Sequence, residues 1–189
     1  MPNNPQAHPL ESFCKLMATP EPPELGPGPR KGVLPLADLN KKLDEHLSRS
    51  GLASSVHQPI RAALLLWHDH LDASHRISQE LHSSDGSLLH GIMHRREPDY
   101  GNAKYWFNRV GKHPCFVELA VKAADLLQTR NENGLKAELA PGGEWDPFAF
   151  IDACECAAGR TVPTSQTQLL REIQQMEFNL LLARFCRID

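Results

Sequence analysis

The sequence predicts an all-α fold, an irregular bundle of six to eight helices with a Pro-rich N-terminal arm. Three observations support this prediction. From Asp38 onward, apolar residues recur three or four positions apart, which is the period of an amphipathic helix. Sustained apolar-polar alternation, the pattern of a half-buried strand, is found nowhere in the sequence. Nine of the 15 prolines precede residue 37, so we divide the 189 residues into an arm over 1–36 and a single helical domain over 37–189.

The Pro-rich arm is expected to lack regular structure over most of its length. Its run TPEPPELGPGPRKGVLP is rich in proline, which fixes φ and has no amide hydrogen, so it cannot sustain a helix or a paired strand. Apolar residues earlier in the arm are candidates to dock on the helical core: Leu10, Phe13, Leu16 and Met17. The alternative is a mobile terminus.

Three helices are predicted in the first half of the helical domain. The first begins at Asp38 and carries leucines at every fourth position. The second is one long helix over 55–81, because Pro59 is tolerated in a first turn and apolar residues continue at helical spacing. A polar turn, SSDGS, then leads into a short helix over 86–97, which Pro98 ends.

Four more helices are predicted in the second half. They run from Asp99 to Gly111, from Pro114 to about Leu127, from Asp146 to about Gly159, and from Thr164 or Ser165 to about Arg187. The segment 131–143 is rich in helix breakers and is expected to be a loop. The last helix is apolar on more than one side, so it is either central to the fold or the contact surface of a homodimer.

The charge balance argues against some classes of partner. With 23 acidic and 20 basic residues the formal charge is -3, which does not favour a broad surface for nucleic acid or for a membrane. No stretch approaches the roughly 20 apolar residues of a membrane span. The start MPNNPQAH lacks the basic-then-apolar order of a secretory signal. We therefore expect a cytoplasmic protein.

Two neighbouring segments each carry three potential metal ligands or proton-transfer groups at helical spacing. They are His68, Asp72 and His75, followed by His90, His94 and Glu97. Residues four and then three positions apart share one face of a helix, so an antiparallel hairpin of the second and third helices can bring these side chains together. We predict a site for a divalent metal such as zinc, manganese or iron, held by His68, Asp72, His75, His90 and His94.

Catalysis is assigned to His75, His94 and Glu97. A bound metal would lower the pKa of a water ligand and generate a nucleophile near neutral pH. Without a metal, the same groups can act as general acid and base, because histidine titrates near neutral pH. The structural alternative is that the histidines form separate hydrogen bonds at the edge of the core and that Asp72 pairs with one of them.

The segment from His94 to His113 mixes basic and aromatic side chains. Guanidinium groups bind carboxylate or phosphate, and aromatic rings stack on planar ligands. We predict a site for a small anionic molecule with these members: Arg95, Arg96, Tyr100, Asn102 and Arg109. The alternative is that Trp106 and its neighbours fill the core while the charges pair or face solvent.

The stretch HGIMHRREPDYGNAKYWFNRVGKHP, with LLLWHDHLDASH before it and WDPFAFIDACE after it, resembles an uncharacterised family of small helical proteins from bacteria and fungi. The resemblance covers most of the chain after Ser55 and implies a helical fold, with no activity to carry over. The word YGNAKYWFNRVG is also similar to the alanine-and-aromatic helix of a tetratricopeptide-like repeat. No second copy follows at a regular period, so a repeat solenoid is not expected.

The favoured hypothesis is a small-molecule enzyme, a metal-assisted hydrolase whose His, Asp and Glu cluster lies on a helical hairpin. Two alternatives stay open: a non-enzymatic module that binds an anionic small ligand, and a helical scaffold for protein interactions. The first hypothesis requires the hairpin side chains to converge on one point.

Overall fold

The computed structural model describes residues 9–158 and 164–187, and within these ranges the chain forms ten α-helices, two short 3₁₀ helices and no strand. The predicted all-α fold is confirmed. The helices outnumber the predicted six to eight, because the arm contains a helix, one predicted helix is divided and part of a predicted loop is helical. The expected helix end near Gly159 lies outside the described residues. None of the described helices is both long enough and apolar enough to cross a membrane.

In chain order, the α-helices are α1 (Pro9–Leu16), α2 (Leu36–Arg49), α3 (His57–Trp67), α4 (Leu71–Ser78), α5 (Ser84–Arg96), α6 (Tyr100–Val110), α7 (Pro114–Thr129), α8 (Asn133–Leu139), α9 (Pro147–Ala158) and α10 (Ser165–Phe185). The 3₁₀ helices are η1 (Ser54–Val56) and η2 (Pro141–Gly143).

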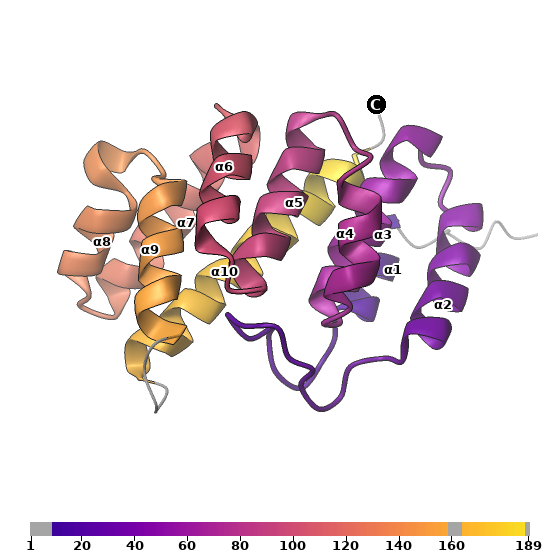
Figure 1. Ribbon diagram of the computed structural model, residues 1–189, viewed down its shortest axis with the longest axis horizontal. Coiled ribbons are helices and arrows are strands. Elements are labelled where there is room, and N and C mark those ends of the chain that lie inside the picture. Colours follow the sequence, from indigo (N-terminus) through magenta and orange to yellow (C-terminus); the bar gives the residue numbers. More distant parts are fainter. Residues whose placement is uncertain (1–8, 159–163, 188–189) are drawn as a thin grey trace, which may run out of the picture.

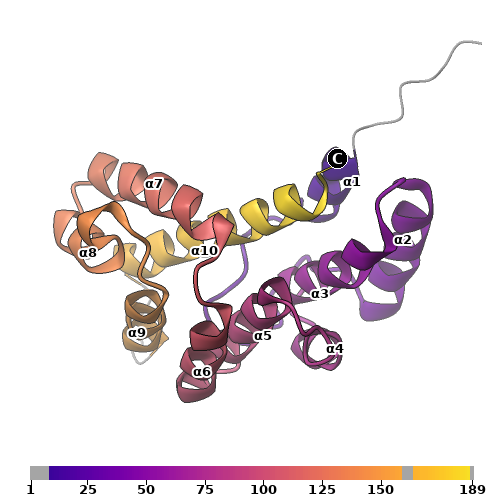
Figure 2. The same ribbon diagram turned by 90° about the horizontal axis from the view of Figure 1, so that it is seen from above.

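Helix α10 runs through the centre of the molecule, with other helices on both sides of it (Figure 1). Figure 2 shows α7 along one side of α10 and α3 on the other, and α10 also contacts α1 and α9. Both apolar stripes of α10 are buried, and Ile173, Phe178 and Leu181 are 0% exposed. The helix begins after Thr164, whose hydroxyl accepts a hydrogen bond from the Thr167 amide. Its central position accounts for its apolar character.

The prediction of one long second helix is wrong, because a short break near its middle separates α3 from α4. Asp69 has a φ of 64° in this break, a left-handed conformation that aspartate tolerates better than most residues. Its carboxylate accepts hydrogen bonds from Arg30 at 2.5 Å and from Arg96 at 2.7 Å. These buried ion pairs hold the break. As a consequence, His68 and His75 do not share one helix face.

Part of the predicted loop over 131–143 is also helical. Helix α8 buries Leu135 and Leu139, which are four positions apart, and packs against α7 and α9. Asn131 and Gly134 obscure this pattern in the sequence, because both are weak helix formers. In this segment tertiary packing outweighs local propensity.

The described part of the arm packs onto the helices and contains one of them, α1, which the sequence did not predict. The predicted docking is confirmed, since the apolar side chains of the arm lie in or against the core: Leu10, Phe13, Leu16 and Met17. The irregular, proline-rich stretch after α1 is held by side chains of the bundle. For example, Gln174 of α10 donates to the carbonyl groups of Pro23 and Glu24 at 3.2 and 3.1 Å.

Candidate metal centre

Three histidines from two helices converge on one point. His75 projects from α4, and His90 and His94 project from α5. One ring nitrogen from each lies within 4.8 Å of the other two. The ring centroids are 4.7 Å apart for His75 and His90, and 5.2 Å apart for His75 and His94. Within the described residues, this is the one group of His, Cys, Asp and Glu side chains that can hold a metal ion.

The spacing along α5 places two of these rings together. His90 and His94 are four positions apart, so they lie one above the other on the same face of the helix. Their rings are stacked, with centroids 4.8 Å apart and an angle of 16° between the planes. The Ser83 hydroxyl accepts a hydrogen bond from the Gly86 amide and caps the start of α5. The cap lies at the end of the turn that connects α4 to α5. This turn brings His75 of α4 next to His90 and His94.

Helix α6 covers His90 from another direction. Gly91 permits a close approach of α6, because a Cβ atom there would lie 2.6 Å from the Phe107 ring. Trp106 consequently stacks on His90, with ring centroids 3.9 Å apart and planes 15° apart. Sequence reasoning considered Trp106 as a ring that stacks on a planar ligand or as a core residue, and it did not place Trp106 against the histidines. The signal that could have found its role is the glycine next to His90, since glycine often marks a close approach of backbone.

Burial favours neutral rings in this cluster. His90 and His94 are only 3% and 5% exposed. Burial, followed by the proximity of His94 and His75, lowers the pKa of His90 to about 4. Burial also lowers the pKa of His94, although the neighbouring Glu97 carboxylate opposes this effect. Neutral imidazole is the form that binds metals, so both residues are in the ligating form at neutral pH.

The hydrogen bonds of the rings are compatible with metal ligation. Nδ1 of His94 lies 3.2 Å from a carboxylate oxygen of Glu97, which leaves the other ring nitrogen available. A carboxylate in this position commonly orients a metal-binding histidine. Nδ1 of His90 is buried and has no hydrogen-bond partner among the described residues. Such an unsatisfied buried nitrogen costs free energy, and a metal ion is one partner that would satisfy it.

The arrangement fits an open metal site. Three protein ligands with a solvent molecule in the fourth position are typical of catalytic zinc centres, whereas structural zinc centres have four protein ligands. Glu97 contacts His94 and is not one of the three candidate ligands. What the geometry can do chemically is bind a divalent cation and present a polarised water to a substrate.

His68, a predicted ligand, does not reach the cluster. It is 1% exposed and lies in the break between α3 and α4. Its Nε2 atom lies 2.8 Å from the carbonyl oxygen of Leu16, and its Nδ1 atom accepts from the Leu34 amide at 3.1 Å. Both ring nitrogens therefore hold the arm against the bundle.

Asp72, the other predicted ligand from this segment, is exposed and is not part of the three-histidine group. It lines a hollow of about 380 Å³ together with Arg76 and Glu97. Because Glu97 also contacts His94, this hollow adjoins the cluster.

Arg95 and Arg96, two of the predicted ligand-binding residues, have their partners inside the fold. Both are 0% exposed. Arg95 donates to Glu177 at 2.5 Å and to Gln174 at 3.3 Å. Arg96 donates to Asp69 at 2.7 Å and to carbonyl groups of the arm. These side chains join α5 to α10 and to the arm, and the structure does not bring them to a solvent-facing site.

The remaining predicted ligand-binding residues lie on α6. Tyr100 is partly buried against the core. Asn102 is exposed, and its amide donates to Asp99, which caps the helix. Arg109 is exposed, and its guanidinium carbon lies 5.3 Å from the centroid of the Trp106 ring. Arg109 is therefore the member of this set that is linked to the histidine cluster, through Trp106.

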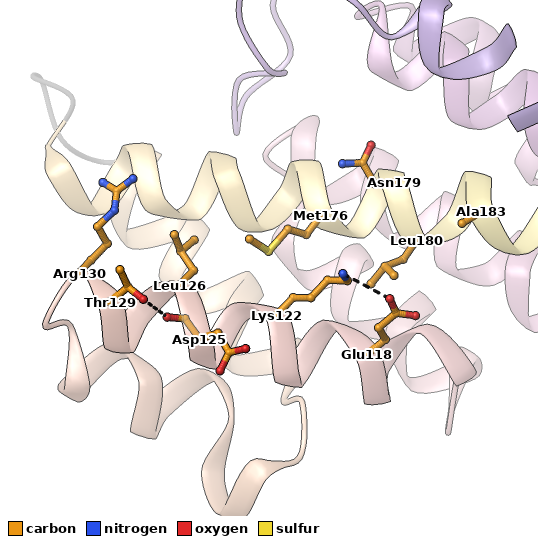
Figure 3. A pocket seen from close by; sticks show the side chains of 10 residues that line it. All are labelled: Glu118, Lys122, Asp125, Leu126, Thr129, Arg130, Met176, Asn179, Leu180 and Ala183. Atoms are coloured by element: carbon orange, nitrogen blue, oxygen red, sulfur yellow. Dashed lines mark hydrogen bonds and ion pairs between the residues drawn. The ribbon is translucent and has the colours of Figure 1, made fainter. Parts of the chain in front are cut away.

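Another hollow, of about 710 Å³, lies between α7 and α10 (Figure 3), and no histidine of the described chain lines it. Leu126 of α7 and Met176 and Leu180 of α10 line it, and Figure 3 shows Lys122 paired with Glu118. The nitrogen and oxygen of this pair are 3.4 Å apart. The hollow is lined by apolar side chains and by an ion pair whose charges neutralise each other. Unlike the histidine cluster, it has no group of described side chains that converge on one point as metal ligands. A homodimer through α10 stays a prediction.

In comparisons with known proteins, no family model, curated protein or solved structure matched the chain. The resemblance to helical proteins of bacteria and fungi stays a prediction, and function is inferred from the site itself.

Proposed function

We propose that the protein binds a divalent transition metal through His75, His90 and His94 and uses it to hydrolyse a small molecule. The observation that supports this proposal is the convergence of three ring nitrogens within 4.8 Å. Three imidazole ligands suit zinc best among the predicted metals, while manganese favours oxygen ligands and iron sites usually include a carboxylate.

In the proposed reaction, a metal held by His75, His90 and His94 would lower the pKa of a bound water and supply a hydroxide nucleophile near neutral pH. Its oxygen forms a bond to an electrophilic carbon or phosphorus of the substrate, the bond to the leaving group breaks, and the leaving group takes up a proton. Glu97 is the candidate to accept the proton from the water and to return it to the leaving group, because its side chain is 46% exposed and contacts His94. His75 and His94, predicted as catalytic from the sequence, act as ligands in this scheme.

The hollow beside Glu97 is the proposed substrate site. Its volume of about 380 Å³ is near the lower end of small-molecule sites, which are roughly 300–1,000 Å³. Arg76 lines this hollow, is exposed and forms no ion pair within the described chain. It can therefore bind the anionic group of a substrate, the task that the sequence had suggested for Arg95 and Arg96.

Metal analysis of the purified full chain tests the proposal. We expect about one equivalent of zinc after reconstitution and removal of unbound metal, because the cluster has a single centre. The double variant His75→Ala with His94→Ala should lose this zinc, whereas His82→Ala, an exposed histidine outside the cluster, should retain it. Full retention of zinc in the double variant would overturn the site.

Hydrolysis needs its own assay. The zinc-loaded chain and the metal-free chain are compared on a panel of small carboxylic and phosphoric esters with a chromogenic leaving group. Turnover should require zinc and should fall at least tenfold in Glu97→Ala if this carboxylate transfers the proton. If zinc binds but no ester is turned over, the hydrolase part of the proposal is wrong and the metal has a structural role.

A second candidate function is a metal-free module that binds an anionic small molecule. Arg109 favours it, because its guanidinium group lies over Tyr105 at 5.9 Å and over Trp106 at 5.3 Å, measured from the guanidinium carbon to the ring centroids. Such a module should bind benzoate or inorganic phosphate in the presence of a chelator. Arg109→Ala should weaken that binding, measured by tryptophan fluorescence, whereas Lys122→Ala on the distant α7 should not.

A further inference from the structure

Another cavity lies where the end of α6, the start of α7 and the segment before α9 meet. Its volume is about 610 Å³, which is within the size range of small-molecule sites. Aromatic side chains from three separate parts of the chain line it: Phe107, Phe116, Trp145 and Phe148. Because these residues come from three segments, the cavity depends on tertiary contacts.

The walls of this cavity are held by contacts outside it. His113, which also lines the cavity, places Nε2 2.9 Å from a carboxylate oxygen of Asp85 on α5. The Trp145 ring packs against Phe150, with centroids 5.2 Å apart. The amide of Asp146, the next residue, donates to a carbonyl group of α8 at 2.9 Å. The aromatic residues are therefore fixed before any ligand arrives.

Trp145, which lines the cavity, carries a hydrogen-bond donor without a partner within the described residues. Trp145 is 8% exposed, and its indole Nε1 atom is buried without a hydrogen-bond partner in the part of the chain that is described. At the rim, Lys112 is exposed and has no ion pair among the described residues. Val117 and Phe148 are 74% and 38% exposed beside it, which is unusual for large apolar residues.

We propose that this cavity binds a flat aromatic molecule that carries a carboxylate. The rings of the wall favour a flat aromatic body, because such rings stack or meet edge to face. The unsatisfied indole N–H requires an acceptor oxygen, since a buried donor without a partner is unfavourable. Lys112 favours a negative charge on that acceptor. The site shares no lining residue with the histidine cluster and does not depend on a bound metal.

Titration of the ¹⁵N-labelled full chain with 2-naphthoate tests this proposal. The protein has 3 tryptophans, so it gives separate indole N–H resonances, and the one missing in Trp145→Phe belongs to Trp145. This resonance should shift in a saturable manner, whereas those of Trp67 and Trp106 should not. Trp145→Phe keeps an aromatic ring but removes the donor and part of the ring area, and it should weaken binding by about tenfold. Lys112→Ala should weaken it about threefold, because the charge is exposed.

Two exposed valines on adjacent turns of α7 provide a matched control. Val117 lines the cavity, whereas Val121, 58% exposed, does not. Val117→Ser should weaken binding several-fold and Val121→Ser should leave it unchanged, while His94→Ala should also bind as the parent does. Equal effects of the two valine variants would reveal nonspecific adhesion and overturn the proposal. So would tighter binding of 2-naphthylmethylammonium, or a Trp145 resonance that stays unmoved at millimolar 2-naphthoate.

Discussion

Three consecutive residues of α5, His94, Arg95 and Arg96, project into two kinds of environment. The two arginines are buried, and carboxylates and carbonyl groups of the fold accept hydrogen bonds from their terminal guanidinium nitrogens, while Nε of Arg95 has no partner within the described residues. Around His94 the polar atoms are only partly satisfied, since the neighbouring His90 has a buried Nδ1 without a partner among the described residues. Buried charges that are paired within the fold maintain its structure, whereas a cluster of neutral rings with a free ring nitrogen is a candidate for a ligand.

The largest effect on stability is expected when one partner of the buried Arg95–Glu177 ion pair is removed. Glu177→Ala leaves the Arg95 guanidinium buried and without its counter-ion, so the free energy of unfolding should fall by about 3–5 kcal/mol. Urea unfolding followed by circular dichroism measures this change. His94→Ala, in the other environment, should cost less, about 1–2 kcal/mol.

A second variant separates the ion pair from the packing around it. Replacing both partners, Arg95→Met with Glu177→Leu, removes the buried charges together and should recover much of the stability that Glu177→Ala loses. If Glu177→Ala costs no more than His94→Ala, the distinction between the two environments is wrong.

The next effect concerns the dependence of stability on pH in the metal-free chain. The pKa of His90 is lowered to about 4 in the folded protein, below its value of about 6.5 in an unfolded chain. Between these values the unfolded state binds a proton that the folded state does not, so stability falls as the pH falls from about 6.5 to 4. One pKa unit corresponds to about 1.4 kcal/mol, and the loss from this residue is on the order of 2–3 kcal/mol.

The measurement is a series of urea unfolding curves at several pH values through this window. Other acidic groups titrate there as well, so the difference between the parent chain and His90→Ala isolates the contribution of this ring. His82→Ala, which removes an exposed histidine, should leave the pH slope unchanged. Parallel slopes for the parent and His90→Ala would show that His90 takes no part.

These two environments also show how far sequence reasoning reaches. The convergence of His75, His90 and His94 follows from helical spacing and from a tight turn between two helices, and both features are visible in the sequence. The position of His68 could not be predicted in the same way. It depends on Asp69 in a left-handed conformation, which arginines distant in the sequence hold in place.

The arginines illustrate the same limit for the candidate binding site. From the sequence alone, Arg95 and Arg96 cannot be distinguished from a ligand-binding pair, because their carboxylate partners are distant along the chain. Glu177 is on α10 and Asp69 is in the break between α3 and α4. Local helices were predictable because their signals are local, whereas the satisfaction of a charge depends on tertiary contacts. The lining of the cavity beside Trp145 depends on tertiary contacts in the same way.

A smaller effect is expected when the packing beside the cluster is changed. In Gly91→Ala, the new Cβ atom would lie 2.6 Å from the Phe107 ring, which is 1% exposed and has little room to move. Helix α6 must then shift away from α5, at a cost of about 1–3 kcal/mol. Gly101→Ala is the matched control, because its nearest atom would be 4.0 Å away, and it should be neutral or slightly stabilising. Thermal unfolding compares the two variants, and equal losses would contradict the close approach.

The smallest effect is expected at Glu97, which contacts His94 from the surface. Glu97→Gln keeps the shape of the side chain but removes the charge that opposes the lowering of the His94 pKa. Zinc affinity should fall about tenfold, which corresponds to about 1.4 kcal/mol, because such a carboxylate orients the ligating ring and increases its basicity. Stability of the metal-free chain should hardly change, since the side chain is 46% exposed. Competition with a zinc-chelating dye measures the affinity, and Glu80→Gln, an exposed acid outside the cluster, is the control. Equal zinc affinity in Glu97→Gln and the parent chain would mean that the carboxylate contacts His94 without tuning it as a ligand.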